Sequence, residues 1–170
     1  SASGAVRMIR DAIATARRAG ASGPVLVRAD SAYCSAAIVA ATRKAGAHYS
    51  IGIGMNPPVR RAIAAINDDA WTRIQYPQAI LDTDTGQLVC AAEIAEISYT
   101  AFTSKPKRHQ VTTRLIVRRI PELNTNKLAG QDPLFPLFRY HALITDNPPT
   151  SSPPKHSTAV TPSSNKSSPT

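Results

Sequence analysis

The sequence predicts an α/β fold, because two strand-like runs flank a helix-like segment and later segments alternate between apolar and polar residues. The runs at 25–29 and 48–53 are short and apolar, with β-branched or aromatic residues, and an alanine-rich segment at 32–45 lies between them. A strand, a helix and a strand at this spacing are typical of a βαβ unit with a parallel strand pair. With 170 residues, 42% of them hydrophobic, the chain is long enough for one domain with a buried core.

A helix is predicted over 4–19, ahead of the first strand. Val6, Ile9 and Ile13 recur at helical spacing, arginines lie on the opposite side, and Gly20 closes the pattern. We therefore expect an amphipathic helix with a basic face.

After residue 57 the period changes from helical to alternating. Pro57 and Pro58 open a short helix that runs to residue 66. Strands are then expected at 71–76, 87–91, 94–103, 109–120 and 137–145, with a loop at 121–136. This pattern predicts a β-rich insertion over about 68–136.

The tail at 147–170 differs in composition from the rest of the chain. It consists mostly of Pro, Ser and Thr and contains neither an acidic nor an aromatic residue. Such a segment cannot bury a core, so we expect it to be disordered.

The charge balance favours an anionic partner. The formal net charge is +9 and the pI is about 10.1, as in many proteins that bind nucleic acid. Cys34 and Cys90 are the only cysteines, lie far apart in the sequence and lack metal-type spacing. We therefore interpret them as ordinary buried thiols, which predicts a reducing compartment. With no membrane helix and no signal peptide recognised, we expect a cytoplasmic protein and no membrane partner.

Asp30 is the residue that most strongly indicates function. It follows the strand at 25–29, and carboxyl ends of parallel strands open into the crevice where α/β proteins bind ligands. Asp is also a preferred helix N-cap, since its oxygen accepts a backbone N–H of the first turn. Spacing alone leaves both interpretations open.

Four segments in order resemble one family. They are VLVRADSAY at 25–33, PPVRRAIAAINDDAW at 57–71, EISYTAFTSKPKRHQVTTRLIVRRI at 96–120 and FRYHALITD at 138–146. They are similar to the catalytic domain of bacterial DDE transposases of the insertion sequence 1380 type. The resemblance implies a partial ribonuclease H-like fold over 1–146, with the β-rich insertion between the second and third catalytic acids. It also implies DNA strand cleavage and transfer.

By this resemblance Asp30 corresponds to the second catalytic Asp and to a metal ligand. The chemistry uses three carboxylates that hold two Mg²⁺ ions about 4 Å apart. The family's first Asp would precede residue 1, and its third acid, a Glu, would fall in 147–170, which has no acid. We therefore expect this chain to be inactive. A shifted reading frame from Pro149 permits a sequence similar to the family's third-acid helix, so the tail is interpreted as out-of-frame translation.

Several basic residues are candidates for DNA contact. Lys105, Lys107 and Arg108 form the densest basic cluster, which suits either a loop that grips phosphates or a solvated turn. Arg114 and Arg118 share one face of the strand at 109–120, while the other face is apolar, so that face could meet DNA.

Trp71 and Arg28 each have two interpretations. An aromatic residue in such an insertion stacks on a flipped base in some related transposases, but packing of Trp71 in the core is the safer interpretation. Arg28 lies on the same strand face as Asp30 and could approach a phosphate or pair with that carboxylate.

Two alternatives to a transposase fragment remain. One is a non-catalytic remnant that binds transposon ends in the bacterial nucleoid and competes with an intact transposase. The other is a free-standing nuclease that uses Asp30 with Asp82, Asp84 or Glu93.

Overall fold

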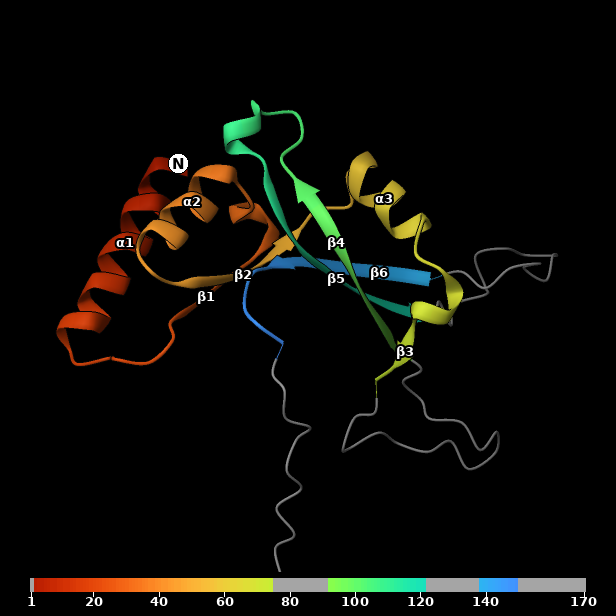
Figure 1. The fold of residues 1–170 in the computed structure, drawn as a ribbon, viewed down its shortest axis with the longest axis horizontal. Coiled ribbons are helices and arrows are strands. Elements are labelled where there is room, and N and C mark those ends of the chain that lie inside the picture. The colour runs from red at the N-terminus through yellow and green to blue at the C-terminus, as the bar shows by residue number, and fades with distance from the viewer. Residues whose placement is uncertain (1, 75–91, 122–137, 150–170) are drawn as a thin grey trace, which may run out of the picture.

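The chain forms a mixed α/β fold around one six-stranded sheet (Figure 1). The computed structural model describes residues 2–74, 92–121 and 138–149. The strands are β1 (Leu26–Ala29), β2 (His48–Ile53), β3 (Thr72–Arg73), β4 (Glu93–Ala101), β5 (Val111–Pro121) and β6 (Phe138–Thr145), in the spatial order β1-β2-β6-β5-β4-β3. The predicted parallel pair is confirmed, with Leu26 opposite His48 and Ala29 opposite Ile51. All other neighbours in the sheet are antiparallel.

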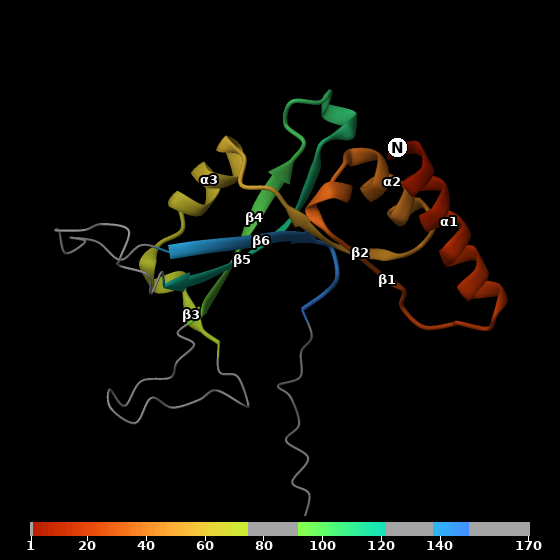
Figure 2. The same ribbon diagram turned by 180° about the vertical axis from the view of Figure 1, so that it is seen from behind.

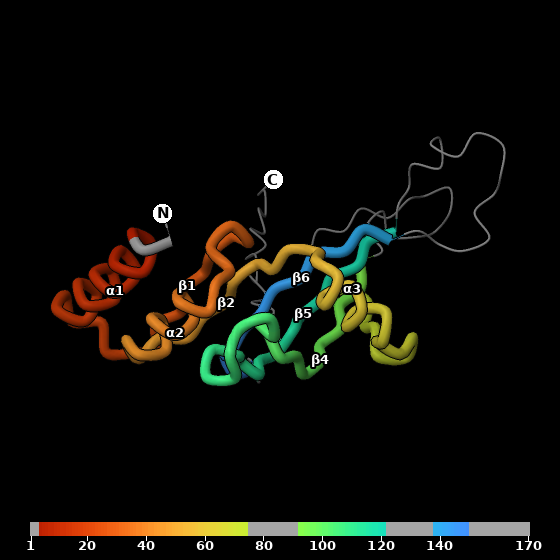
Figure 3. The backbone as a smooth tube through the Cα atoms, turned by 90° about the horizontal axis from the view of Figure 1, so that it is seen from above, coloured from red at the N-terminus to blue at the C-terminus, as the bar shows by residue number. Residues whose placement is uncertain are grey.

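Three helices accompany the sheet in the described part of the chain. They are α1 (Ala2–Arg18), α2 (Ala36–Lys44) and α3 (Pro57–Ala64). Figure 2 shows α1 and α2 side by side at one end of the molecule and α3 at the other, and Figure 3 shows the elements between them as a twisted row.

The helix expected at 32–45 is shorter than predicted. Residues Ser31–Tyr33 form a separate 3₁₀ turn, η1, and α2 starts only at Ala36. The reason is that Asp30 and Ser35 each cap a helical segment in an extended conformation, and Cys34 between them is also extended. Two caps five residues apart therefore split one expected helix into two.

Other boundaries also differ from the prediction. A 3₁₀ turn, η3 (Lys107–His109), occupies the expected start of the 109–120 strand, and β5 continues through Pro121. A further 3₁₀ turn, η2 (Asp68–Ala70), precedes β3. The strand expected at 87–91, Cys90 and nearly all of the predicted loop and tail lie outside the described residues.

One face of the sheet carries the core. Tyr49, Ile51, Leu115, Val117 and Ile144 are fully buried on this face. They pack with apolar residues of all three helices, namely Ile9, Ile13, Ile38, Val39, Val59 and Ile63. Each such side chain contributes about 1.5–3 kcal/mol by leaving water. The alternation of each strand puts its remaining residues on the opposite face.

We call that opposite face the open face and define it by Arg28, Ser50, Arg118 and His141. The core cluster places apolar residues of α1, α2 and α3 on the other side of the sheet. No helix in the described ranges is long and apolar enough to cross a membrane.

A buried ring of hydrogen bonds joins the parallel strand pair to the antiparallel strands. The Tyr49 hydroxyl donates to Thr113 Oγ1 at 2.8 Å, and Thr113 Oγ1 donates to the Thr145 carbonyl at 2.8 Å. Thr145 Oγ1 in turn donates to the Tyr49 carbonyl at 2.6 Å. Burial raises the pKa of the Tyr49 hydroxyl, which therefore stays a donor at neutral pH. The ring fixes β2, β5 and β6 relative to one another.

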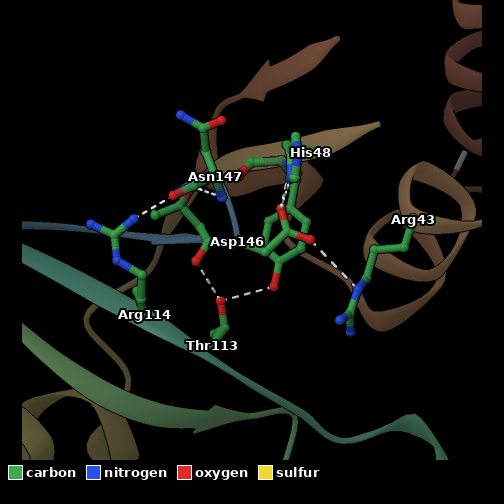
Figure 4. A network of polar contacts seen from close by, with 8 residues as sticks. Arg43, His48, Thr113, Arg114, Asp146 and Asn147 are labelled. Atoms are coloured by element: carbon green, nitrogen blue, oxygen red, sulfur yellow. Dashed lines mark hydrogen bonds and ion pairs between the residues drawn. The ribbon is translucent and has the colours of Figure 1, made fainter. Parts of the chain in front are cut away.

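Asp146, directly after β6, adds a charged contact at the same place (Figure 4). Its Oδ1 accepts the Tyr49 N–H at 2.9 Å and lies 3.5 Å from His48 Nδ1. Its Oδ2 lies 3.5 Å from Arg43 Nε. The carboxylate thus ties the end of β6 to the start of β2 and to the last turn of α2.

Candidate functional site

Asp30 lies at the carboxyl end of β1, as the sequence predicts, and its side chain is exposed. It is the N-cap of η1, and its Oδ1 accepts the N–H of Ser31. The capping interpretation is therefore confirmed for this short turn, although not for α2. The cap involves one carboxylate oxygen, so the second oxygen is left for other ligands.

Gly52 in β2 determines how closely the Asp30 turn approaches the sheet. A Cβ atom at this position would lie 3.0 Å from Ser31 N, 3.5 Å from Ser31 Cα and 3.6 Å from the Asp30 carbonyl carbon. Contacts this short to backbone atoms force either the turn or the strand to move. A glycine at position 52 therefore allows the backbone of Asp30 and Ser31 to approach β2 closely.

A groove of about 630 Å³ crosses the open face next to this turn. Arg28 and Asp30 of the β1 end, Ser50 and Gly52 of β2, Arg118 of β5 and His141 of β6 line it. Among the described residues that line the groove, Asp30 is the only carboxylate, whereas two arginines share it. This balance favours an anionic ligand.

Arg28 contributes to the groove without being neutralised by its neighbour. Within the described residues no ion pair joins Arg28 to Asp30, although both lie on the same face. The Arg28 side chain is exposed. Of its two predicted interpretations, the structural ion pair is not formed in this structure.

The described side chains do not by themselves make a metal site. No group of three or more His, Cys, Asp or Glu residues within the described ranges could hold a metal ion. Hard divalent cations such as Mg²⁺ take several oxygen ligands, and one exposed carboxylate supplies too few. Asp30 could provide one ligand, but not the set that two-metal chemistry needs.

Arg114 is engaged within the protein rather than directed at the groove. Its guanidinium donates to both oxygens of Glu96. It also donates to the Asn147 carbonyl (Figure 4). The hydrogen bond from Arg114 lowers the pKa of Glu96, and the same bond raises the pKa of Arg114. The two arginines that the sequence places on one strand face thus have different surroundings.

The basic cluster lies in the loop between β4 and β5, as predicted. Lys105, Lys107 and Arg108 are all exposed. A cavity of about 330 Å³ separates the root of this loop from the residues that follow Asp30, since Ser31 lies on one wall and Ser104 on another. The structure therefore brings the basic cluster near the turn that carries the candidate acid.

Trp71 is half-buried and packs against the core, as one of its two interpretations expects. The guanidinium carbon of Arg119 lies 4.1 Å from the Trp71 ring centroid and 4.5 Å from the Phe138 ring centroid. The Arg119 Nε also donates to Glu93 at 2.5 Å. Trp71 is thus part of a cation–π cluster at the end of the sheet.

Glu93, one of the acids considered for a nuclease site, is paired with Arg119 in this cluster. It does not line the groove that contains Asp30. Asp82 and Asp84 lie outside the described residues.

Four residues of the site were missed from the sequence. Gly52, Gln110, Arg119 and His141 act through neighbours that are distant in the chain or that depend on the loop conformation. For His141 the alternation of the last strand carried a usable signal, because it puts this residue on the face of the strand that Ala142 and Ile144 do not occupy. The other three gave none.

Comparison with known proteins identifies the family. The model of the family described as transposase DDE domain, group 1, matches residues 1–126 of this chain. No curated protein matches the chain. The matched region includes Asp30, Trp71 and the basic cluster, and it covers well over half of the sequence. The chain therefore belongs to the transposases with a DDE domain of group 1.

Proposed function

We propose that this chain is a fragment of a DDE transposase of the insertion sequence 1380 type, and that it holds transposon-end DNA along the groove of the open face. The observation that carries the proposal is that the groove brings Arg28 and Arg118 together with Asp30 on one sheet face. Guanidinium groups suit phosphate oxygens, and Asp30 would meet the backbone that they hold.

Within this proposal Asp30 is the family's second catalytic acid, a metal ligand. The βαβ unit followed by antiparallel strands supports a partial ribonuclease H-like fold over residues 1–146. The described residues do not complete a metal-binding set. We therefore propose that this chain binds DNA without cutting it, and that cleavage needs acids beyond those that the described residues supply.

Binding is tested by titrating the chain with duplexes carrying transposon terminal repeats at several salt concentrations. Arg28→Ala should weaken binding and reduce the log–log salt slope by about 0.9, the value for one lost phosphate contact. Arg10→Ala is the matched control, since Arg10 is an exposed arginine on α1 away from the groove. Salt-independent binding, or an equal loss in both variants, would contradict the proposal.

The predicted lack of activity is tested separately. A Mg²⁺-dependent nicking assay should show no cleavage by the chain or by Asp30→Asn, while Asp30→Asn still binds DNA. Cleavage by the unmodified chain that Asp30→Asn abolishes would instead support the free-standing nuclease.

A second function follows if binding occurs without cleavage. The chain would then act as a DNA-binding remnant that competes with an intact transposase for transposon ends. The basic groove favours this role, and so does the lack of a complete metal-binding set among the described residues. Adding the chain to a transposition assay with an intact relative should lower the yield, and an Arg28→Ala chain should lower it less.

The tail has its own test. We propose that residues after about Pro149 are translated out of frame. Sequencing the locus should reveal a family-like helix in an alternative frame, and an alternative frame that encodes no such helix would remove this interpretation.

A further inference from the structure

The loop between β4 and β5 has a defined internal structure. We call residues 102–110 the basic hairpin. Phe102 adopts a φ of 62°, a left-handed conformation that costs a bulky residue about 1–2 kcal/mol and reverses the chain. The Lys105 N–H donates to the Phe102 carbonyl at 2.9 Å, and the His109 N–H donates to the Pro106 carbonyl at 2.8 Å. The hairpin therefore has a hydrogen-bonded turn structure although most of it is exposed.

Gln110 connects the two arms of the basic hairpin. Its side-chain Nε2 donates to the Lys105 carbonyl at 2.8 Å and to the Thr103 carbonyl at 3.3 Å. One amide group carries two N–H donors, so it can serve both carbonyls. Gln110 is half-buried, whereas residues 103–109 are exposed. It is the one side chain in the described structure that bridges the arms of this loop.

The two hydrogen bonds of Gln110 hold the backbone of the segment that carries the three basic side chains. Lys105, Lys107 and Arg108 follow within four positions, and none of them forms an ion pair with an acid among the described residues. Among the described residues, the Arg108 side chain donates only to His109 Nε2, at 3.1 Å. Ordering such a loop before binding removes an entropy cost of about 0.5–1.5 kcal/mol for each side chain that binding would otherwise immobilise.

We propose that Gln110 is the positioning residue of the basic hairpin, and that it preorganises the hairpin to bind the phosphate backbone of DNA beside the Asp30 turn. This inference rests on the proposed function, because it assigns the partner of the hairpin to the same DNA. Phosphate contacts fix register without reading sequence, so the hairpin contributes affinity rather than specificity. Phe102, Thr103 and Ser104 at its root line the same cavity as Ser31, the residue that follows the candidate acid.

The test uses Gln110→Met, which keeps the length of the side chain and removes both donors. Hydrogen exchange of the Lys105 and His109 amides should become severalfold faster. Thr100→Ala is the matched control, because it removes a side-chain hydrogen bond to Thr112 in the adjoining strands and leaves the hairpin intact. Exchange that stays unchanged in Gln110→Met would overturn the proposal.

DNA binding gives the second readout on the same full-length chains. Gln110→Met should lower affinity for duplex DNA severalfold with the salt slope retained, because all cations remain. Lys105→Ala should lower both affinity and slope, the slope by about 0.9. Faster exchange with unchanged DNA affinity would overturn the role in binding. If the unmodified chain fails to bind DNA at all while exchange responds as expected, the proposed function fails and the bridge by Gln110 remains.

Discussion

At the scale of single residues, Gly52 shows how a missing side chain can support a candidate acid. Gly52→Ala places a methyl group 3.0 Å from Ser31 N, so the turn that carries Asp30 must shift. We expect a loss of about 1–3 kcal/mol in the free energy of unfolding, as for overpacking elsewhere. Urea denaturation measures this loss. Gly54→Ala is the control, because a Cβ there meets nothing within 4 Å, and equal losses in both variants would contradict the contact.

Glu96 gives the fold a defined acid sensitivity. Arg114 lowers the pKa of Glu96 from its ordinary value of 4.5 in the folded chain, so the pair stabilises the fold above that pH. This stability is lost as the pH falls below 4.5 through the lowered folded pKa. Because Glu96 is exposed, we expect only about 0.5 kcal/mol. Stability measured between pH 6 and about 3 should fall less steeply in Glu96→Gln than in the unmodified chain. Parallel curves would rule out this contribution.

The sequence alone identified the residues whose chemical role can be recognised without knowing their neighbours in the fold. Asp30 and Lys105 could be selected because a carboxylate after a strand and a cation in a loop are informative alone. Gly52 and Gln110 could not, because their roles depend on backbone atoms of the η1 turn and of the hairpin. Local pattern carries no information about such neighbours until the fold is known.

At the scale of elements, the caps explain where helices begin. Asn56 Oδ1 accepts the Val59 N–H at 3.1 Å at the start of α3, whereas Ser35 Oγ lies 3.4 Å from the Ile38 N–H at the start of α2. We expect Asn56→Ala to lower the free energy of unfolding by about 1 kcal/mol. Ser35→Ala, with its longer bond, should cost less in the same thermal or urea unfolding experiment. The reverse order would show that bond length does not govern these two caps.

The elements themselves could largely be predicted, while their ends and their neighbours could not. Periodicity identified α1, both strands of the parallel pair and the long antiparallel strands. It missed the split between η1 and α2 because Asp30 and Ser35 both have cap chemistry, and an alanine-rich run gives no signal for choosing between them. It also gave no indication that β6 lies between β2 and β5, since alternation predicts a strand but not its partners.

At the scale of the whole molecule, the ring through Tyr49 holds the two halves of the sheet together. Tyr49→Phe removes a buried hydroxyl that donates to Thr113, and we expect it to lower the free energy of unfolding by about 1 kcal/mol. Tyr99→Phe makes the same chemical change in a half-buried tyrosine whose hydroxyl has no hydrogen bond among the described residues. It should leave the urea midpoint nearly unchanged, and a matching shift in both variants would show that the ring does not join the halves.

The central place of β6 has a consequence for how the molecule is made. Residues 138–145 are the last of the described strands to leave the ribosome, yet they pair with β2 on one side and β5 on the other. Until they emerge, the nascent chain presents two sheet edges that await the same strand, and such edges pair readily with other chains. The described sheet can therefore be completed only after residue 145 has emerged, so we expect the unfinished chain to depend on chaperones while it is being translated.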